Sequence, residues 1–278
     1  MSTIRIIFQK FLRRHIGKSA FDRESPLNQT QSALVFSPHF DDETLGCGGT
    51  IIAKRSAGAR VVIAFMTDGS TSHKQFLPAE ELRRLRKNEG LNAAKALGVN
   101  STDVVFLGYE ESRLCEKESK ATCKVKHLIE EYNPEEIFIP HTNEPDLWSG
   151  DHLATNRIVK SALRSLHKSK IVCEYPIWYW FHWPWVGMDI RDGRYFRIIG
   201  KNTLAFSLGI RSLNDFNYSV YVDEFLEQKR NALMQHRTQM TRFVEDERWI
   251  TLSDIANGQF LSCFFTDFEY FYRYSFSL

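Results

Sequence analysis

The stretch SALVFSPHFDDETLGCGGTIIAKRSAGARVVIAFM, residues 32–66, decides the fold. Residues 32–37 form an apolar run that is typical of a buried strand, and residues 60–66 form a second one. Between them, residues 43–57 are expected to form a helix, and Gly58 follows as a natural C-terminal cap. Strand, helix and strand in this order predict two neighbouring parallel strands, the first of which leads directly into a polar segment.

The alternation of strands and helices continues to residue 175. Further strands are expected at 103–107, 136–140 and 170–175, and further helices at 79–97, 119–132 and 151–167. This order predicts the fold class α/β, as a Rossmann-like, three-layer, mostly parallel and doubly wound sheet. Beyond residue 175 the pattern changes, and a strand at 220–222 and a helix at 224–239 are expected there.

The composition is that of an ordinary globular domain and narrows the classes of partner. The chain has 278 residues and a net charge of +2, so nothing argues for nucleic-acid binding. It contains no apolar run long enough to span a membrane, and the apolar stretch 4–8 is too short for a secretory signal. The five cysteines lack CxxC spacing, which argues against a disulfide framework and a thiolate zinc site and favours a reducing, cytoplasmic compartment.

We expect residues 31–278 to form a single domain and residues 1–30 to form a separate N-terminal segment with its own sequence pattern. Apolar residues recur at helical spacing between positions 4 and 16, with basic residues between them. Two interpretations are open: a basic amphipathic helix whose residues 4–18 contact a membrane or glycolipid surface, and a helix packed on the domain. The first makes the protein membrane-peripheral. Residues 22–31 are expected to form a polar linker.

Metal-ligand residues follow the first and fourth strands. His39 and Asp42 are three residues apart, so both can face one point where the chain turns into a helix. Two histidines with one carboxylate and an open position are a known catalytic zinc arrangement. Asp151 and His152 follow the fourth strand, and in a 3-2-1-4-5 order the first and fourth strands flank the ligand crevice. The alternative is that the aspartates only cap the helices beside them.

The segment around His39 resembles the LmbE-like family of zinc-dependent deacetylases, which includes the N-acetylglucosaminyl-phosphatidylinositol (PIG-L) deacetylases. Their signature Pro-His-Pro-Asp-Asp-Glu, followed by glycines, reads here as residues 38–43 with Phe40 in place of the second proline. Weaker matches, among them a late helix motif that contains His236, extend the resemblance to residues 32–240. It implies a hydrolase that removes an N-acyl group, acetyl by analogy, from an amino sugar.

The resemblance also implies roles for individual residues. The ligands of Zn²⁺, or of another divalent transition metal, are expected to be His39, Asp42 and His152. Asp41 is the expected general base, which takes a proton from the attacking water and passes it to the leaving amine. Arg86 is expected to orient the substrate or a carboxylate, and Asp151 to orient His152 or a neighbouring donor.

A second departure from the family pattern bears on the mechanism. Relatives have His-x-Asp-His where this chain has Ser149-Gly150-Asp151-His152, so Ser149 replaces a histidine thought to stabilise the oxyanion or assist the leaving group. We expect another histidine to approach the substrate: His236 first, because it lies in the shared late motif, and His141 second, because it follows the fourth strand. Because of this substitution, the alternative that the protein binds a sugar or nucleotide without catalysing a reaction also stays open.

The sequence leaves the substrate and the role of one aromatic segment open. An amino sugar in a glycan precursor, in a nucleotide sugar or in a glycolipid fits equally well. The Trp-rich segment 176–187 either stacks on sugar rings or packs in the core. A two-metal phosphoesterase is disfavoured because the motifs hold few carboxylates. A Rossmann dehydrogenase is disfavoured because the glycines at 46–49 lack the required spacing directly after the strand.

Overall fold

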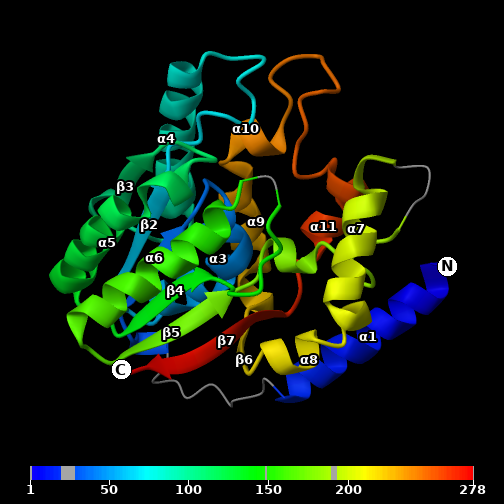
Figure 1. Ribbon diagram of the computed structural model, residues 1–278, viewed down its shortest axis with the longest axis horizontal. Coiled ribbons are helices and arrows are strands. Elements are labelled where there is room, and N and C mark those ends of the chain that lie inside the picture. Colours follow the sequence, from blue (N-terminus) through cyan, green and yellow to red (C-terminus); the bar gives the residue numbers. More distant parts are fainter. Residues whose placement is uncertain (1, 20–28, 148, 189–192, 278) are drawn as a thin grey trace.

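The computed structural model describes residues 2–19, 29–147, 149–188 and 193–277 (Figure 1). Its described part contains a seven-stranded sheet in the order β3-β2-β1-β4-β5-β7-β6. The strands are β1 (Ala33–Ser37), β2 (Val61–Thr67), β3 (Val104–Tyr109), β4 (Glu136–Pro140), β5 (Lys170–Tyr175), β6 (Tyr218–Tyr221) and β7 (Phe268–Phe276). The first five are parallel in the expected 3-2-1-4-5 order, and β7 runs antiparallel to both β5 and β6.

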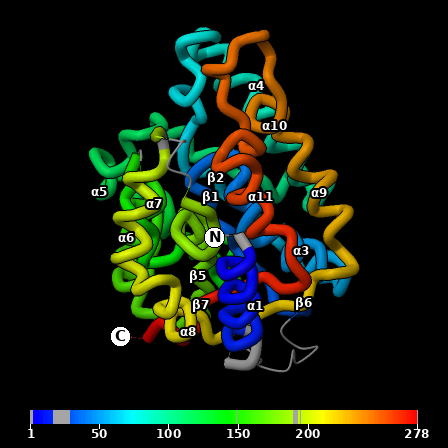
Figure 2. The backbone as a smooth tube through the Cα atoms, turned by 90° about the vertical axis from the view of Figure 1, so that its right-hand side faces the viewer, coloured from blue at the N-terminus to red at the C-terminus, as the bar shows by residue number. Residues whose placement is uncertain are grey.

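Helices cover both faces of the sheet, as Figure 2 shows. The helices are α1 (Ser2–Ser19), α3 (Asp42–Ser56), α4 (Ala79–Ala96), α5 (Glu118–Tyr132), α6 (Asp151–Leu166), α7 (Gly193–Ala205), α8 (Ser212–Asp215), α9 (Leu226–Met234), α10 (Arg237–Met240) and α11 (Gln259–Ser262). Val35 of β1 packs into the core with α3, whereas its neighbour Phe36 packs into the core with α5 and α6. Because β1 is buried on both faces, it reads as a continuous apolar run. The predicted doubly wound α/β fold is confirmed.

Close packing of α3 positions the polar segment at its start. A Cβ at Gly46 would overlap the ring of Tyr175, and one at Gly49 would lie 2.5 Å from the side chain of Val222. The hydroxyl of Tyr175 donates to the carbonyl oxygen of Phe36 at 2.7 Å. Glycine at these positions therefore lets α3 lie against the end of β5 and against Val222, which follows β6.

The C-terminal part differs from expectation in detail. The strand expected at 220–222 is β6 at Tyr218–Tyr221, and it pairs with β7, which sequence analysis did not identify. The helix expected at 224–239 is divided into α9 and α10. The division falls at His236, whose ψ of 62° lies outside the helical range.

Helix α1 packs on the domain with one face and leaves another exposed. Leu12 and Ile16 are fully buried in the main core, and Nη1 of Arg5 donates to the carbonyl oxygen of Trp185 at 3.1 Å. By contrast, Ile4 is 72% exposed and Ile7 63% exposed. None of the helices in the described ranges has the length and apolar character needed to cross a bilayer. The predicted linker lies mostly outside the described residues.

Candidate metal centre and active site

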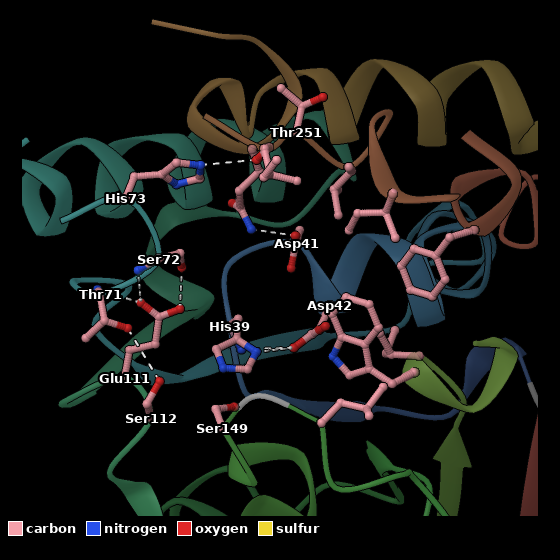
Figure 3. Close-up of a pocket in the computed structure, with 18 of the residues that line it drawn as sticks. His39, Asp41, Asp42, Thr71, Ser72, His73, Glu111, Ser112, Ser149 and Thr251 are labelled. Atoms are coloured by element: carbon pink, nitrogen blue, oxygen red, sulfur yellow. Dashed lines mark hydrogen bonds and ion pairs between the residues drawn. The ribbon is translucent and has the colours of Figure 1, made fainter. Parts of the chain in front are cut away.

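Three side chains meet beyond the carboxyl ends of β1 and β4. His39 follows β1, Asp42 begins α3, and His152 lies in the first turn of α6. Nδ1 of His39 is 3.3 Å from Oδ2 of Asp42 and 3.2 Å from Nε2 of His152. The third edge, from Nε2 of His152 to the same Oδ2, is 3.3 Å. The two clusters that follow neighbouring strands therefore converge on one point, and Figure 3 shows His39 and Asp42 facing each other there.

These three atoms form a donor set that a divalent cation fits. Nε2 of His39 lies 3.2 Å from Oδ2 of Asp151, so we assign the ring proton to Nε2 and a lone pair to Nδ1. Two imidazole nitrogens and a carboxylate oxygen that face one another repel unless a proton or a metal cation lies between them. Tetrahedral ligands bound at about 2.0 Å are roughly 3.3 Å apart, which matches all three edges. Their assignment as ligands stays a prediction that metal analysis tests.

A buried carboxyl group lies behind each imidazole. Asp151 contacts His39 and accepts backbone N–H groups from Ser112 at 2.7 Å and Leu114 at 3.2 Å. Of the two partners expected for Asp151, this contact favours the neighbouring donor, here His39, over His152. The cause is simple: α6 begins at Asp151, so consecutive side chains diverge around the helix and point to different partners.

The carboxylate behind His152 belongs to Glu144, which sequence analysis did not identify. Its Oε2 lies 3.6 Å from Nδ1 of His152, and its oxygens accept N–H groups from Ile177 and Trp178 at 2.7 Å and from Tyr179 at 3.2 Å. Burial raises the pKa of Glu144 to about 8, although the three N–H groups favour the charged form. The only feature of the sequence that pointed to Glu144 was its position in the loop between β4 and the Asp151-His152 pair.

Asp41 lies beside the ligand triangle without belonging to it. Its carboxylate lines the pocket, and Oδ2 accepts a hydrogen bond from Nε2 of Gln239. The backbone at Asp41 has a φ of 128°, which non-glycine residues rarely adopt, and its N–H donates to Oε2 of Glu43 at 3.1 Å. Burial and the charge of Asp42 raise the pKa of Asp41 well above its usual value. A strained, buried carboxylate of this kind is typical of a proton-transfer group.

The two histidines expected near the substrate lie elsewhere. Nε2 of His236 is 2.8 Å from Oε1 of Glu43, and both side chains are fully buried. Nδ1 of His141 accepts the N–H of Asn143 at 3.0 Å, and its Nε2 is 3.2 Å from the carbonyl oxygen of Asp215. Neither ring lines the pocket, so the expectation is corrected: each is held by partners outside it.

Arg86 reaches the pocket from α4 and is buried there. Its Nη1 donates to Oγ of Ser72 at 3.1 Å and lies 3.7 Å from Oε1 of Glu111. Its Nη2 is 3.2 Å from Nδ1 of His73, whose Nε2 lies 3.1 Å from the carbonyl oxygen of Ile250. Burial and the charge of Arg86 lower the pKa of His73 to about 4, so the ring is neutral at pH 7. Sequence analysis identified Arg86 but not its partners, because their loops carry no motif.

The pocket has a volume of about 500 Å³ and is lined by both polar and apolar residues. In Figure 3, Thr71, Ser72, Glu111 and Ser112 lie to one side of His39, and we call this part of the pocket its polar half. Ser149, the residue that departs from the family pattern, also lines the pocket. The apolar residues that line the pocket include Leu45, Ile177, Trp178, Tyr195, Ile198 and Phe260.

The Trp-rich segment divides between the pocket and the core. Trp178 lines the pocket, whereas Trp180 and Trp185 are almost fully buried in the main core. The ring of Trp183 stacks on Phe8 of α1 at 5.3 Å between centroids. Core packing therefore accounts for most of the segment, and of the three tryptophans Trp178, Trp180 and Trp185 only Trp178 lines the pocket and is placed to stack on a sugar.

Several known proteins resemble this chain. Residues 34–163 match the family model described as PIG-L, GlcNAc-PI de-N-acetylase. The diacetylchitobiose deacetylase of Thermococcus kodakarensis is 24% identical over 242 residues, which cover 84% of this chain and 79% of that protein. The probable N-acetyl-alpha-D-glucosaminyl L-malate deacetylase 2 of Bacillus cereus is 32% identical over 145 residues, which cover 49% of this chain and 63% of that protein.

A solved structure shares the architecture. The N,N'-diacetylchitobiose deacetylase from Pyrococcus horikoshii matches with a TM-score of 0.65 at 21% identity, over 96% of this chain and 91% of that chain. This likeness shows the fold. The family match covers β1 to α6, the part of the chain that contains the ligand triangle.

Proposed function

We propose that the protein is a metal-dependent hydrolase that removes an N-acetyl group from an amino sugar, because residues 34–163 match the PIG-L (LmbE-like) family model. One observation carries the proposal: His39, Asp42 and His152 present three facing ligand atoms in a pocket that Asp41 also lines. The related proteins are named as deacetylases, and the names of two refer to diacetylchitobiose or an N-acetylglucosaminyl compound. A glycan precursor, a nucleotide sugar and a glycolipid remain the candidate carriers of that sugar.

The proposed metal is Zn²⁺. Two imidazole nitrogens and one carboxylate oxygen suit a borderline-soft cation, and other divalent transition metals accept the same donors. A cation held there polarises the amide carbonyl and lowers the pKa of a coordinated water. Asp151 and Glu144 keep the two imidazoles in the tautomers that ligation requires, because each faces the ring nitrogen opposite the site.

Asp41 is the proposed general base. In the charged form its carboxylate takes a proton from the attacking water, and in the protonated form it delivers that proton to the leaving amine. Gln239 donates to Oδ2 of Asp41 and so holds the carboxylate toward the pocket. The strained backbone of Asp41 also points the carboxylate toward the pocket. A hydrogen bond from the N–H of Asp41 to the carboxylate of Glu43 in α3 holds this backbone conformation.

Substrate binding is assigned to the polar half of the pocket. Arg86 and Ser149 line it and supply hydrogen-bond donors for sugar hydroxyls or for the carbonyl oxygen as it becomes negative. His141 is left out of this assignment, because both its ring nitrogens have partners outside the pocket. His236 is instead a positioning residue that acts on Glu43.

A second candidate function is sugar binding without catalysis. The observation in its favour is that no described histidine that lines the pocket replaces the family histidine at Ser149: His39 belongs to the ligand triangle, and both ring nitrogens of His73 are engaged. Release of free amine from N-acetylglucosamine, with the metal content of the same sample, separates the two functions. Amine release that disappears with a chelator and returns with Zn²⁺ supports the hydrolase, and metal binding without amine release supports the binding protein.

The domain organisation and the surroundings of the protein form a further part of the proposal. We treat residues 31–278 as one catalytic domain on which α1 packs through Leu12 and Ile16. The exposed side of α1, with Ile4 and Ile7, is then available for peripheral contact with a membrane that carries a lipid-linked substrate. All five cysteines are free, which suits the cytoplasm.

A further inference from the structure

Two side chains from distant parts of the sequence bind the backbone of α3 between its first and second turns. In a regular helix the N–H of Gly49 donates to the carbonyl oxygen of Leu45, four residues earlier. Here the Leu45 carbonyl accepts a hydrogen bond from Nζ of Lys229 at 2.9 Å, and the Gly49 N–H donates to Oε1 of Glu269 at 2.8 Å. The N–H of Thr50 donates to Oε2 of the same carboxylate at 2.8 Å. One pair of side chains therefore binds both backbone groups that a regular helix joins at this step.

The two side chains form a buried ion pair. Nζ of Lys229 lies 2.8 Å from Oε1 of Glu269 and also donates to the carbonyl oxygen of Phe264 at 2.7 Å, so each N–H of the ammonium group has an acceptor. Lys229 is 0% exposed and Glu269 is 5% exposed. Lys229 belongs to α9, which packs against α3, and Glu269 belongs to β7 (Figure 1). The pair thus attaches α3 to the C-terminal part of the fold.

Gly48 gives Lys229 access to the helix. A Cβ at Gly48 would lie 3.0 Å from Cγ of Lys229, which is closer than an ordinary contact. Glycine inside a helix is less favourable than alanine, so its presence here needs a reason. The path of the lysine side chain supplies that reason, and it gives a use to one of the glycines at 46–49 that the sequence pattern left without a function.

The bound step is connected to the ligand triangle through the first turn of α3. Leu45, whose carbonyl binds Lys229, donates its own N–H to the carbonyl oxygen of Asp41 at 2.8 Å. Asp42 lies within this turn and presents Oδ2 to His39. A metal site requires its ligand atoms to be held within about 0.5 Å of the productive geometry, so the placement of this turn matters for binding.

We propose that Lys229 and Glu269 are positioning residues for the predicted metal centre: they fix the first turn of α3, and with it Asp42, relative to the two histidines. This inference rests on the metal-dependent function proposed above. Charged groups suit the task, because hydrogen bonds from an ammonium and to a carboxylate are stronger than those between neutral groups. Groups that orient a metal ligand from outside typically change metal affinity by about 10- to 100-fold when they are removed.

A double variant tests the proposal, and a second ion pair on the same helix is its control. Lys229→Met with Glu269→Gln removes both charges, so neither is left buried without a partner. Lys54→Met with Glu136→Gln does the same to a buried pair in the last turn of α3, where Nζ lies 2.5 Å from Oε2. Chemical denaturation shows that each protein is folded.

The probe is Co²⁺, which accepts the same donors as Zn²⁺ and has a visible spectrum that depends on ligand geometry. The Lys229 and Glu269 double variant is expected to bind Co²⁺ about 10- to 100-fold more weakly, with a changed spectrum at saturation. The Lys54 and Glu136 double variant is expected to keep the Kd and spectrum of the wild type. A wild-type Kd and spectrum in the first variant, or equal changes in both, overturn the inference.

Gly48→Ala provides a milder test that does not remove a buried charge. The added methyl group displaces Lys229, whereas Gly200→Ala in α7 places its methyl group where no atom lies within 4 Å. Alanine favours the helix at both positions, so a loss of helix stability is not expected in either variant. Gly48→Ala is expected to weaken Co²⁺ binding several-fold, and Gly200→Ala to leave it unchanged. Equal Kd values in the two variants overturn the inference.

Release of amine from N-acetylglucosamine, measured on the same proteins, separates this inference from the proposed function. If the wild type releases no amine but binds Co²⁺, and only the Lys229 and Glu269 variant loses affinity, the inference stands and the hydrolase function fails. If the wild type releases amine with its metal and this variant binds Co²⁺ as tightly as the wild type, the hydrolase function stands and the inference fails.

Discussion

Glu144 and His152 face each other inside the protein, with Oε2 of the carboxylate 3.6 Å from Nδ1 of the imidazole. Glu144 lies in the loop that joins β4 to α6, and His152 lies in the first turn of α6. Because Nε2 of His152 points to the ligand triangle, Glu144 is placed to bind the N–H on the other side of the ring. The same carboxylate binds the backbone after β5, so it links a proposed ligand to the wall of the pocket.

We predict that at pH 9, above the Glu144 pKa of about 8, Glu144→Gln weakens metal binding by about 10- to 100-fold, because a neutral amide holds the imidazole less firmly than a carboxylate does. Competition with a chelator, followed by metal analysis, measures the change. Asp146→Asn in the same loop is the control, since Asp146 is exposed. If Glu144→Gln retained its metal as well as the wild type does, Glu144 would have no role in metal binding.

Asp41→Asn is expected to retain its metal and to lose at least about 100-fold in turnover, the usual scale for a lost general base. Asparagine tolerates positive φ better than most residues, so the backbone at 128° is expected to survive the change. Asp42→Asn is the matched comparison and is expected to lose metal. If Asp41→Asn also lost its metal, the two roles would be reversed.

His236→Ala is expected to reduce the free energy of unfolding by about 3 kcal/mol, because Glu43 loses its partner at 2.8 Å in a fully buried site. Turnover per folded, metal-loaded molecule is expected to fall by less than about tenfold, since His236 does not line the pocket. His141→Ala is expected to retain turnover for the same reason. Chemical denaturation, metal analysis and amine release are measured on each variant. A loss of 100-fold or more in turnover at full metal content would show that the imidazole reaches the substrate.

The Glu111 carboxyl predicts a pH dependence of stability. Burial opposes its charged form, but the charge of Arg86 lowers the pKa of Glu111 to about 2. A depressed carboxyl pKa stabilises the folded protein above the unfolded value of about 4.5, and this contribution is lost as the pH falls toward 2. The full contribution is on the order of 3 kcal/mol. Urea denaturation between pH 6 and pH 3, with chelator present so that metal release plays no part, is expected to show a steeper decline for the wild type than for Glu111→Gln. Parallel declines would contradict the assignment.

Contact between α1 and a membrane predicts binding to vesicles. Ile4 and Ile7 are exposed, so the double variant Ile4→Ser and Ile7→Ser is expected to bind several-fold less to vesicles that contain phosphatidylserine, with unchanged thermal stability. Cosedimentation measures the binding. Met234→Ser on α9 is the control, because Met234 is also exposed but lies on a different helix. If the wild type did not bind vesicles, α1 would serve only to pack on the domain, and the prediction of membrane contact would be wrong.

Much of the fold could be predicted because the relevant information is local. The strands β1, β2 and β4 read as apolar runs because each is buried on both faces by helices that follow in sequence. Strand β7 was not predicted because its partners, β5 and β6, lie far from it along the chain. No local sequence pattern indicates such a pairing.

The amino-acid sequence by itself determined the doubly wound sheet and the convergence of His39, Asp42 and His152, because strand order brings residues at two neighbouring strand ends together. Only the tertiary structure decided which carboxylate stands behind each imidazole and that His236 turns to Glu43. Those contacts depend on the paths of loops and on burial, and they join groups separated along the chain by spacings that no periodicity encodes.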